Sequence, residues 1–120
     1  MIDRMLATAR TRIPRYSPAE AAAAEDILLV DVRTGDERRA TGVIPGSVHV
    51  ARSMLEWRAD PTSSSHDPSL RGKRLVIVCA QGYSSSLAAV TLVDLGVDAG
   101  DLDGGFEAWA AAGLPVVEPA

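Results

Sequence analysis

The chain has 120 residues, of which 47% are hydrophobic and 23% are charged, and its formal net charge is −4. This length and composition are typical of one water-soluble domain that buries its own core without disulfides. The negative charge argues against a nucleic-acid partner, because binding a phosphate backbone requires clustered Lys and Arg side chains.

The single cysteine, Cys79, cannot form an internal disulfide, so we expect a reducing, cytoplasmic location. No apolar run is long enough for a secretory signal or a membrane span, and no membrane partner is expected. Four arginines crowd the N-terminus among apolar side chains, namely Arg4, Arg10, Arg12 and Arg15. Transit peptides share this composition, but we favour a short amphipathic helix that packs on the domain.

Apolar runs of strand length alternate with helical patterns, which predicts an α/β fold with a mostly parallel sheet. N-cap and capping-box patterns at Ser17 and Thr34 predict two helix starts. The expected elements are, in order, a helix from Pro18 to about Glu25, the strand 27–30, a short helix after Thr34, the strand 47–50, one or two helical turns at 54–58, the strand 75–78, a helix from Leu87 to Leu95, a strand near Leu102 and a helix at 106–111.

Cys79 stands where the strand 75–78 runs into a loop of Gly and Ser, ahead of a helix. Unpaired backbone N–H groups and the positive end of a helix dipole favour a thiolate there. Such surroundings can lower the pKa of a cysteine from about 8.5 to roughly 3.5–7.5. The position therefore suits a nucleophile. The alternative is a structural cysteine that packs as a small apolar residue at the end of a core strand.

Ligands of open parallel sheets bind outside the carboxyl ends of the strands. The predicted strands therefore bring several polar side chains and the cysteine to one rim. These are Asp31 with Arg33, Ala51 with Arg52, Cys79 with its loop, and Asp103 with Gly104.

Four segments stand in a recognisable order and spacing. They are Val30-Asp31-Val32-Arg33 followed by Glu37, then Gly42-Val43-Ile44-Pro45-Gly46-Ser47-Val48-His49-Val50, then the cysteine loop, then Gly104-Gly105-Phe106-Glu107-Ala108-Trp109 with Ala112-Gly113-Leu114-Pro115-Val116. Together they closely resemble a single-domain rhodanese of the stand-alone bacterial type. The resemblance covers 13–117, which leaves 1–12 as an N-terminal extension and 118–120 as a tail. It implies a central, mostly parallel five-stranded sheet flanked by helices on both faces.

The resemblance also implies a sulfurtransferase. The thiolate of Cys79 would take a sulfane sulfur from thiosulfate or a persulfide donor, hold it as a persulfide, and pass it to cyanide or a thiol. The expected partners are a small sulfur-containing anion or a low-molecular-weight thiol, and a protein donor or acceptor is an alternative. No cofactor and no metal are expected.

The loop after the cysteine is the expected anion-binding element. It consists of Ala80, Gln81, Gly82, Tyr83, Ser84 and Ser85. Amides that point inward would stabilise both the thiolate and the persulfide, and a glycine permits the close approach and positive φ of such a curl. The hydroxyls of 84–86 would donate to sulfur or cap the helix. The aromatic ring of Tyr83 would wall the pocket, shape a docking surface or only fill space.

The loop departs from the family pattern in one respect. Many catalytic members carry an arginine five residues after the cysteine, where this chain has Ser84. The related dual-specificity phosphatases carry it six residues after, where this chain has Ser85. Without a guanidinium, bidentate recognition of a tetrahedral oxyanion is weakened. This argues against phosphatase and arsenate-reductase activity and against efficient use of thiosulfate.

Arg52 is the candidate for a partial replacement, because it directly follows the strand 47–50. The alternative is a surface ion pair with Glu56, one helical turn on. If Arg52 serves the donor, Arg52→Ala should slow persulfide formation while leaving the melting temperature nearly unchanged. An unaltered rate would contradict this role.

Most other polar residues are expected to be structural. Asp31 would bind turn amides, and Arg33 would pair with Glu37. His49 would be a satisfied strand histidine rather than a general base, and His66 would be solvated. The two histidines and the cysteine show no metal-ligand spacing. Phe106 and Trp109, three apart on one helix, are expected to anchor the core.

Three functions remain open on the sequence. The first is a sulfurtransferase that turns over through Cys79. The second is a persulfide-relay or protein-binding module with little thiosulfate turnover, which the missing loop arginine favours. The third is a catalytically silent scaffold, against which the cysteine and Gly82 argue.

Overall fold

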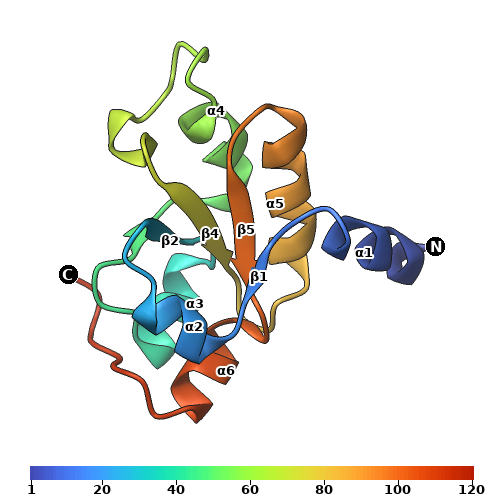
Figure 1. Cartoon of the computed structure of the whole chain (residues 1–120). Coiled ribbons are helices and arrows are strands. Elements are labelled where there is room, and N and C mark those ends of the chain that lie inside the picture. The colour runs from blue at the N-terminus through green and yellow to red at the C-terminus, as the bar shows by residue number, and fades with distance from the viewer.

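The computed structural model describes residues 1–120 and shows one central sheet surrounded by helices (Figure 1). All five strands are parallel and lie in the order β1-β5-β4-β2-β3. They are β1 (Arg15–Tyr16), β2 (Ile27–Asp31), β3 (Val48–His49), β4 (Arg74–Val78) and β5 (Ala99–Leu102). The predicted α/β class and five-stranded parallel sheet are confirmed.

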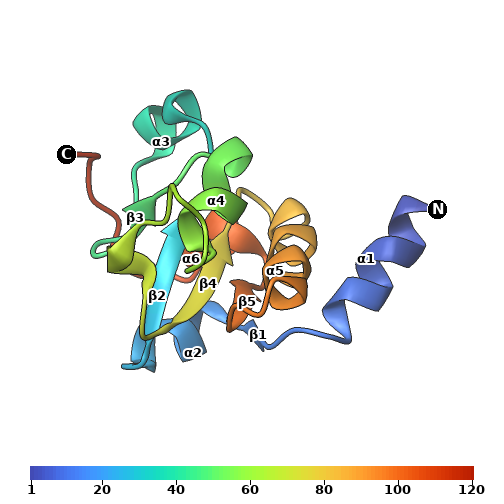
Figure 2. The same cartoon turned by 90° about the horizontal axis from the view of Figure 1, so that it is seen from above.

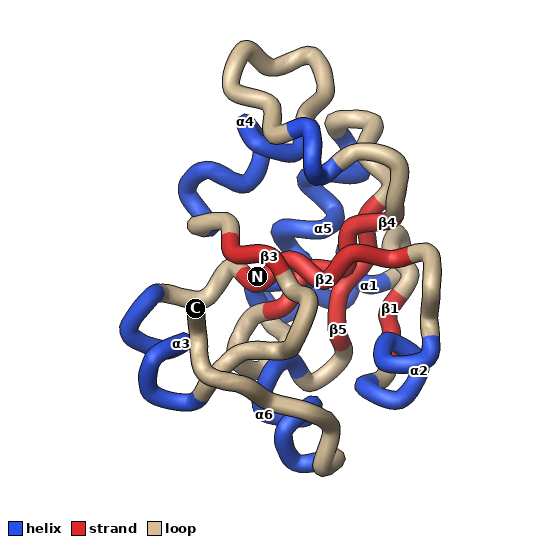
Figure 3. The backbone as a smooth tube through the Cα atoms, turned by 90° about the vertical axis from the view of Figure 1, so that its left-hand side faces the viewer, coloured by secondary structure: helices blue, strands red, loops and turns tan.

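Helices cover both faces of this sheet (Figure 3). They are α1 (Ile2–Arg10), α2 (Pro18–Ala23), α3 (Gly35–Thr41), α4 (Leu55–Ala59), α5 (Ser84–Asp94) and α6 (Gly105–Ala111), with 3₁₀ turns at Arg52–Met54 and Pro68–Leu70. Helices α4 and α5 lie on one face, and α2, α3 and α6 lie on the other. Helix α1 stands outside this arrangement and packs on α5 (Figure 2).

After Arg74, the central strand β4 is apolar because both of its faces are buried. Leu75 and Ile77 belong to the core cluster that contains Leu92 of α5. Val76 and Val78 belong to a second cluster, which contains the buried rings of Phe106 and Trp109. Alternate residues of one strand thus fill two cores, as expected for a parallel sheet between helical layers. The expected anchoring role of the two aromatic residues is confirmed.

The local signals at the helix ends are confirmed. Ser17 and Thr34 each accept a hydrogen bond from the N–H of a glutamate three residues on, at 3.1 Å in both cases; Thr34 forms the predicted capping box, and the predicted N-cap at Ser17 is a full capping box as well. Gly96 has a φ of +81° and follows the end of α5. Only a residue without a Cβ takes this left-handed conformation at little cost.

One expected element begins at a different residue, and one strand has no counterpart among the expected elements. Helix α5 begins at Ser84 rather than Leu87, so three serines form its first turn. The strand β1 was not predicted, because two residues at a sheet edge carry no pattern of their own. No helix of the structure is both long enough and apolar enough to cross a bilayer.

Candidate active site

Cys79 directly follows β4, at the carboxyl end of the sheet, and its side chain is buried. A cavity of about 240 Å³ opens beside it. The walls of this cavity come from the end of β2, from α3 and from the cysteine loop, and they are Val32, Arg33, Glu37, Ala80, Gln81, Tyr83 and Ser84. The structure therefore brings Cys79, its loop and Arg33 together at the predicted rim.

Gly82 turns the loop back toward the sulfur. Its N–H donates a hydrogen bond to Sγ of Cys79 at 3.1 Å, and its φ is +81°. A Cβ at this position would lie 2.7 Å from the backbone nitrogen of Gly104, which is closer than real Cβ atoms approach. Both the conformation and the contact therefore require glycine.

The Gly104-Gly105 turn holds the loop from the other side. The N–H of Phe106 donates to the carbonyl of Cys79 at 2.8 Å, and the N–H of Glu107 donates to that of Ala80 at 3.0 Å. A Cβ on Gly105 would lie 2.5 Å from the carbonyl oxygen of Cys79. The start of α6 thus fixes the backbone from which the sulfur projects.

The environment of the sulfur favours its anion. Burial raises the pKa of Cys79, but hydrogen bonds from the Ser85 and Ser84 hydroxyls and from the N–H groups of Ser85 and Gly82 lower it by more. The net result is a pKa below that of a free cysteine. Hydrogen bonds to a charged acceptor stabilise the charged form, so the thiolate population at neutral pH rises.

Behind the loop lies a carboxylate that the sequence did not reveal. Asp101 of β5 is fully buried and accepts hydrogen bonds from the hydroxyls of Ser85 at 2.8 Å and Ser86 at 2.7 Å. Arg15 pairs with it at 2.9 Å. The helix-capping alternative is not observed, because α5 has Tyr83 at its N-cap and no side-chain cap. These two serines instead tie the first turn of α5 to the sheet.

Ser85 also couples this carboxylate to the sulfur. Its hydroxyl lowers the pKa of Cys79 and also donates a hydrogen bond to Asp101 at 2.8 Å. A hydroxyl has one hydrogen, so the two acceptors compete for it. The 2.8 Å bond to the carboxylate is the well-formed one, which leaves the N–H of Gly82 as the firmest donor to sulfur.

Arg33 lines the cavity, but its predicted ion pair with Glu37 is wrong. The guanidinium folds back onto Asp31, with Nη2 at 2.9 Å from Oδ2, and stacks 3.9 Å from the centre of the Phe106 ring. The Glu37 carboxylate instead accepts a hydrogen bond from the backbone N–H of Thr34 in the capping box. Asp31 accepts from the N–H of Arg33 at 3.0 Å, which confirms its role in the turn.

The structure places Arg52 apart from this group. Its guanidinium pairs with Glu56 at 2.9 Å, and it does not line the cavity beside Cys79. The ion pair is the alternative considered from the sequence. A role in donor binding stays a prediction, and the Arg52→Ala variant described above tests it.

The two histidines lie outside the cavity. Nε2 of His49 is 2.9 Å from the carbonyl oxygen of Arg33, so it is a satisfied strand histidine. The expectation that His66 is solvated is wrong, because the ring is half-buried and its Nε2 is enclosed without a partner.

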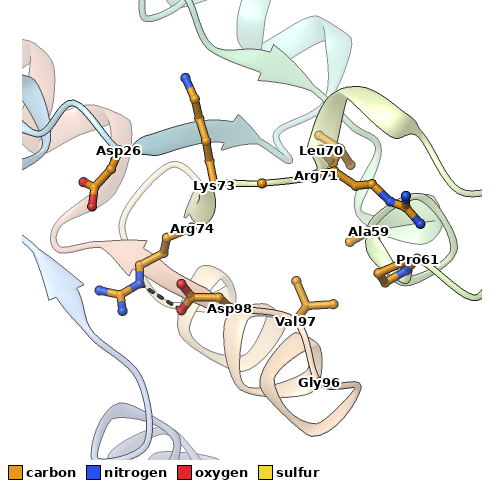
Figure 4. A pocket seen from close by; sticks show the side chains of 11 residues that line it. Asp26, Ala59, Pro61, Leu70, Arg71, Lys73, Arg74, Gly96, Val97 and Asp98 are labelled. Carbon is orange, nitrogen blue, oxygen red and sulfur yellow. Dashed lines mark hydrogen bonds and ion pairs between the residues drawn. The ribbon is translucent and has the colours of Figure 1, made fainter.

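A second cavity, of about 420 Å³, lies at the opposite end of the sheet (Figure 4). It is lined by residues that precede or begin strands, such as Asp26, Lys73 and Asp98. Figure 4 shows Arg74 paired with Asp98, and Lys73 and Arg71 extending in different directions. No Cys, Ser, Thr or His side chain lines this cavity, so we do not take it as the candidate active site.

The structure is a parallel α/β domain that holds a hydrogen-bonded thiol at the end of its central strand, an arrangement that suits reaction through a cysteine anion. A sequence model of the rhodanese-like domain family matches residues 17–112. The chain therefore belongs to the rhodanese-like domain family.

Two sulfurtransferases and one solved structure are similar to this chain. A sulfurtransferase of Allochromatium vinosum is 35% identical over 96 residues, which cover 79% of this chain and 82% of the relative. The thiosulfate sulfurtransferase GlpE of Pseudoalteromonas translucida is 36% identical over 100 residues, covering 78% and 83%. A solved structure from Rhodopseudomonas palustris, of unknown function and described as a possible tyrosine phosphatase, is 37% identical with a TM-score of 0.90 and covers 98% of this chain and 94% of that one.

Proposed function

We propose that this protein is a sulfurtransferase that carries sulfane sulfur as a persulfide on Cys79. The observation that carries the proposal is the bond from the Gly82 N–H to Sγ, 3.1 Å long, at the wall of a small cavity. Membership of the rhodanese-like family and relatives named as sulfurtransferases support it.

The reaction needs no cofactor. The thiolate of Cys79 attacks the outer sulfur of thiosulfate, a bond forms between the two sulfurs, and the sulfur–sulfur bond of the donor breaks to release sulfite. The resulting persulfide is again an anion, so the donors that held the thiolate also serve it. Attack by cyanide on the outer sulfur releases thiocyanate and restores the thiolate. A thiol acceptor would instead leave as a persulfide.

Phosphatase chemistry fits this cavity poorly. A tetrahedral dianion is best held by a guanidinium that offers two parallel N–H groups. Arg33 uses four of its five N–H groups on Asp31, Thr41 and the carbonyl of Gly42. The loop itself contains no arginine. Backbone amides and serine hydroxyls suit a small sulfur anion better.

The same lack of a loop guanidinium favours a second function, in which the protein relays persulfide between protein or low-molecular-weight thiols and turns over little thiosulfate. The exposed ring of Tyr83, 62% accessible beside the cavity, offers a surface for such a partner. Either function suits the reducing cytoplasm, where a single working thiol stays reduced.

Intact-mass spectrometry separates these functions. The protein is incubated with thiosulfate or with a low-molecular-weight persulfide, freed of excess donor, and weighed beside Cys79→Ser. We expect the parent to gain one sulfur atom and the variant to gain none. Steady thiocyanate production with cyanide then selects the thiosulfate enzyme, and loading from persulfide alone selects the relay. No gain from either donor would contradict the proposal.

A further inference from the structure

The loop that holds the sulfur is contacted by a side chain from far outside it. Arg10, the last residue of α1, donates from Nη2 to the carbonyl of Gly82 at 2.8 Å and from Nε to the Ser86 hydroxyl at 3.2 Å. Its guanidinium carbon lies 5.5 Å from the centre of the Tyr83 ring. Helix α1 packs on α5 (Figure 2) and precedes the segment that matches the family.

Gly82 therefore contacts the sulfur through its N–H and arginine side chains through its carbonyl group. Its N–H points at Sγ of Cys79, while its carbonyl accepts from Arg10 and also from Arg15, the latter at 3.2 Å. The N–H belongs to the peptide group 81–82 and the carbonyl to the peptide group 82–83, so two charge-assisted hydrogen bonds on the carbonyl fix the position of the Gly82 Cα that joins the two groups. Arg10 and Arg15 thus hold the loop in its curled conformation from the side that faces away from the sulfur.

Arg10 carries a positive charge that no carboxylate neutralises. Arg15 is neutralised by Asp101 and Asp103, whereas Arg10 forms no ion pair. The other charged groups about the sulfur are Asp31 with its two arginines, Arg33 and Arg38, then Glu37 across the cavity and the exposed Glu107 of α6. Arg10 is therefore the cation without a carboxylate partner that contacts the sulfur loop.

We propose that Arg10 is a positioning residue that holds Gly82 in place through its carbonyl, so that the N–H of Gly82 stays directed at the sulfur, and that it supplies the positive charge that the loop lacks. This inference rests on the proposed function for its purpose, since a stabilised anion serves both thiolate and persulfide. It does not rest on that function for its test, because the reactivity of the thiol is measured without any sulfur donor.

The test is the pH dependence of Cys79 alkylation by iodoacetamide in full-length protein, followed by intact mass. We expect Arg10→Gln to raise the apparent pKa of the thiol by about 0.5–1 unit, the effect of one nearby charge through partly screened protein. Alkylation well below that pKa then slows by roughly threefold to tenfold. Arg10→Lys, which keeps the charge, should recover most of the shift.

Arg12→Gln is the matched control, because Arg12 lies two residues on and pairs with Asp94 on the surface, away from the loop. We expect no change in its alkylation profile. A parental profile in Arg10→Gln would overturn the inference, and so would an equal shift in Arg12→Gln, which would point to undocking of α1. If Arg10→Gln shifts the profile while the parent accepts no sulfur, this inference stands and the proposed function fails.

Discussion

Replacing Asp101 by alanine is expected to lower the free energy of unfolding by about 3–5 kcal/mol, the cost of breaking a buried ion pair by removing one partner. The carboxylate is fully buried and accepts from Arg15, Ser85 and Ser86. Its loss leaves two buried hydroxyls without their acceptor, and it leaves the partly buried Arg15 guanidinium with only the exposed Asp103 and a carbonyl. Denaturant unfolding, followed by circular dichroism, measures the change.

Asp103→Ala is the control for this prediction. Asp103 contacts the same arginine at 3.1 Å, but its side chain is 63% exposed. An exposed pair contributes little, so we expect a change of at most about 1 kcal/mol. A loss at Asp101 no larger than the loss at Asp103 would show that the buried carboxylate does not hold α5 to the sheet.

Gly82→Ala is expected to slow sulfur loading by roughly 10- to 100-fold. The new Cβ would lie 2.7 Å from the nitrogen of Gly104, so the loop must shift and the N–H leaves Sγ of Cys79. A hydrogen bond to a charged acceptor contributes about 1.5–3 kcal/mol, which sets this range. The rate of mass gain with thiosulfate or a persulfide donor measures the effect.

Gly72→Ala separates the backbone cost from the loss of the sulfur bond. Gly72 also has a positive φ, +85°, but a Cβ there meets no atom within 4 Å. It lies at the far end of the sheet, beside the second cavity. We expect Gly72→Ala to lose about 1 kcal/mol of stability and to load sulfur at the parental rate. A parental loading rate in Gly82→Ala would show that the loop amide is dispensable.

Much of the fold followed from the sequence because its signals are local. Each capping box lies within four residues, at Ser17 and Thr34, and the apolar run 75–78 identifies a strand buried on both faces. The rim containing Cys79 then follows from parallel topology alone. The helix start at Ser84 was missed because serines in a first turn read as a loop.

The support of the loop could not be predicted, because its parts are far apart in the chain. Asp101 meets Arg15 across 86 positions, and Arg10 meets Gly82 across 72. A carboxylate between Gly100 and Leu102 in a predicted strand was the available signal, since a buried acid needs a partner. No pattern showed that the partner is an arginine of the N-terminal segment, which composition alone assigned to a solvated helix.

The pairing of β1 with β5 has a consequence for how the edge of the sheet is aligned. Only two residues of β1 are in the ladder, with Arg15 opposite Asp101. So short a strand forms few backbone hydrogen bonds, and these alone do not strongly favour one pairing register over its neighbours. A slip of one residue would turn Arg15 to the opposite face and leave the carboxylate unpaired in the interior. The buried ion pair between Arg15 and Asp101 therefore fixes the register of this two-residue strand against β5.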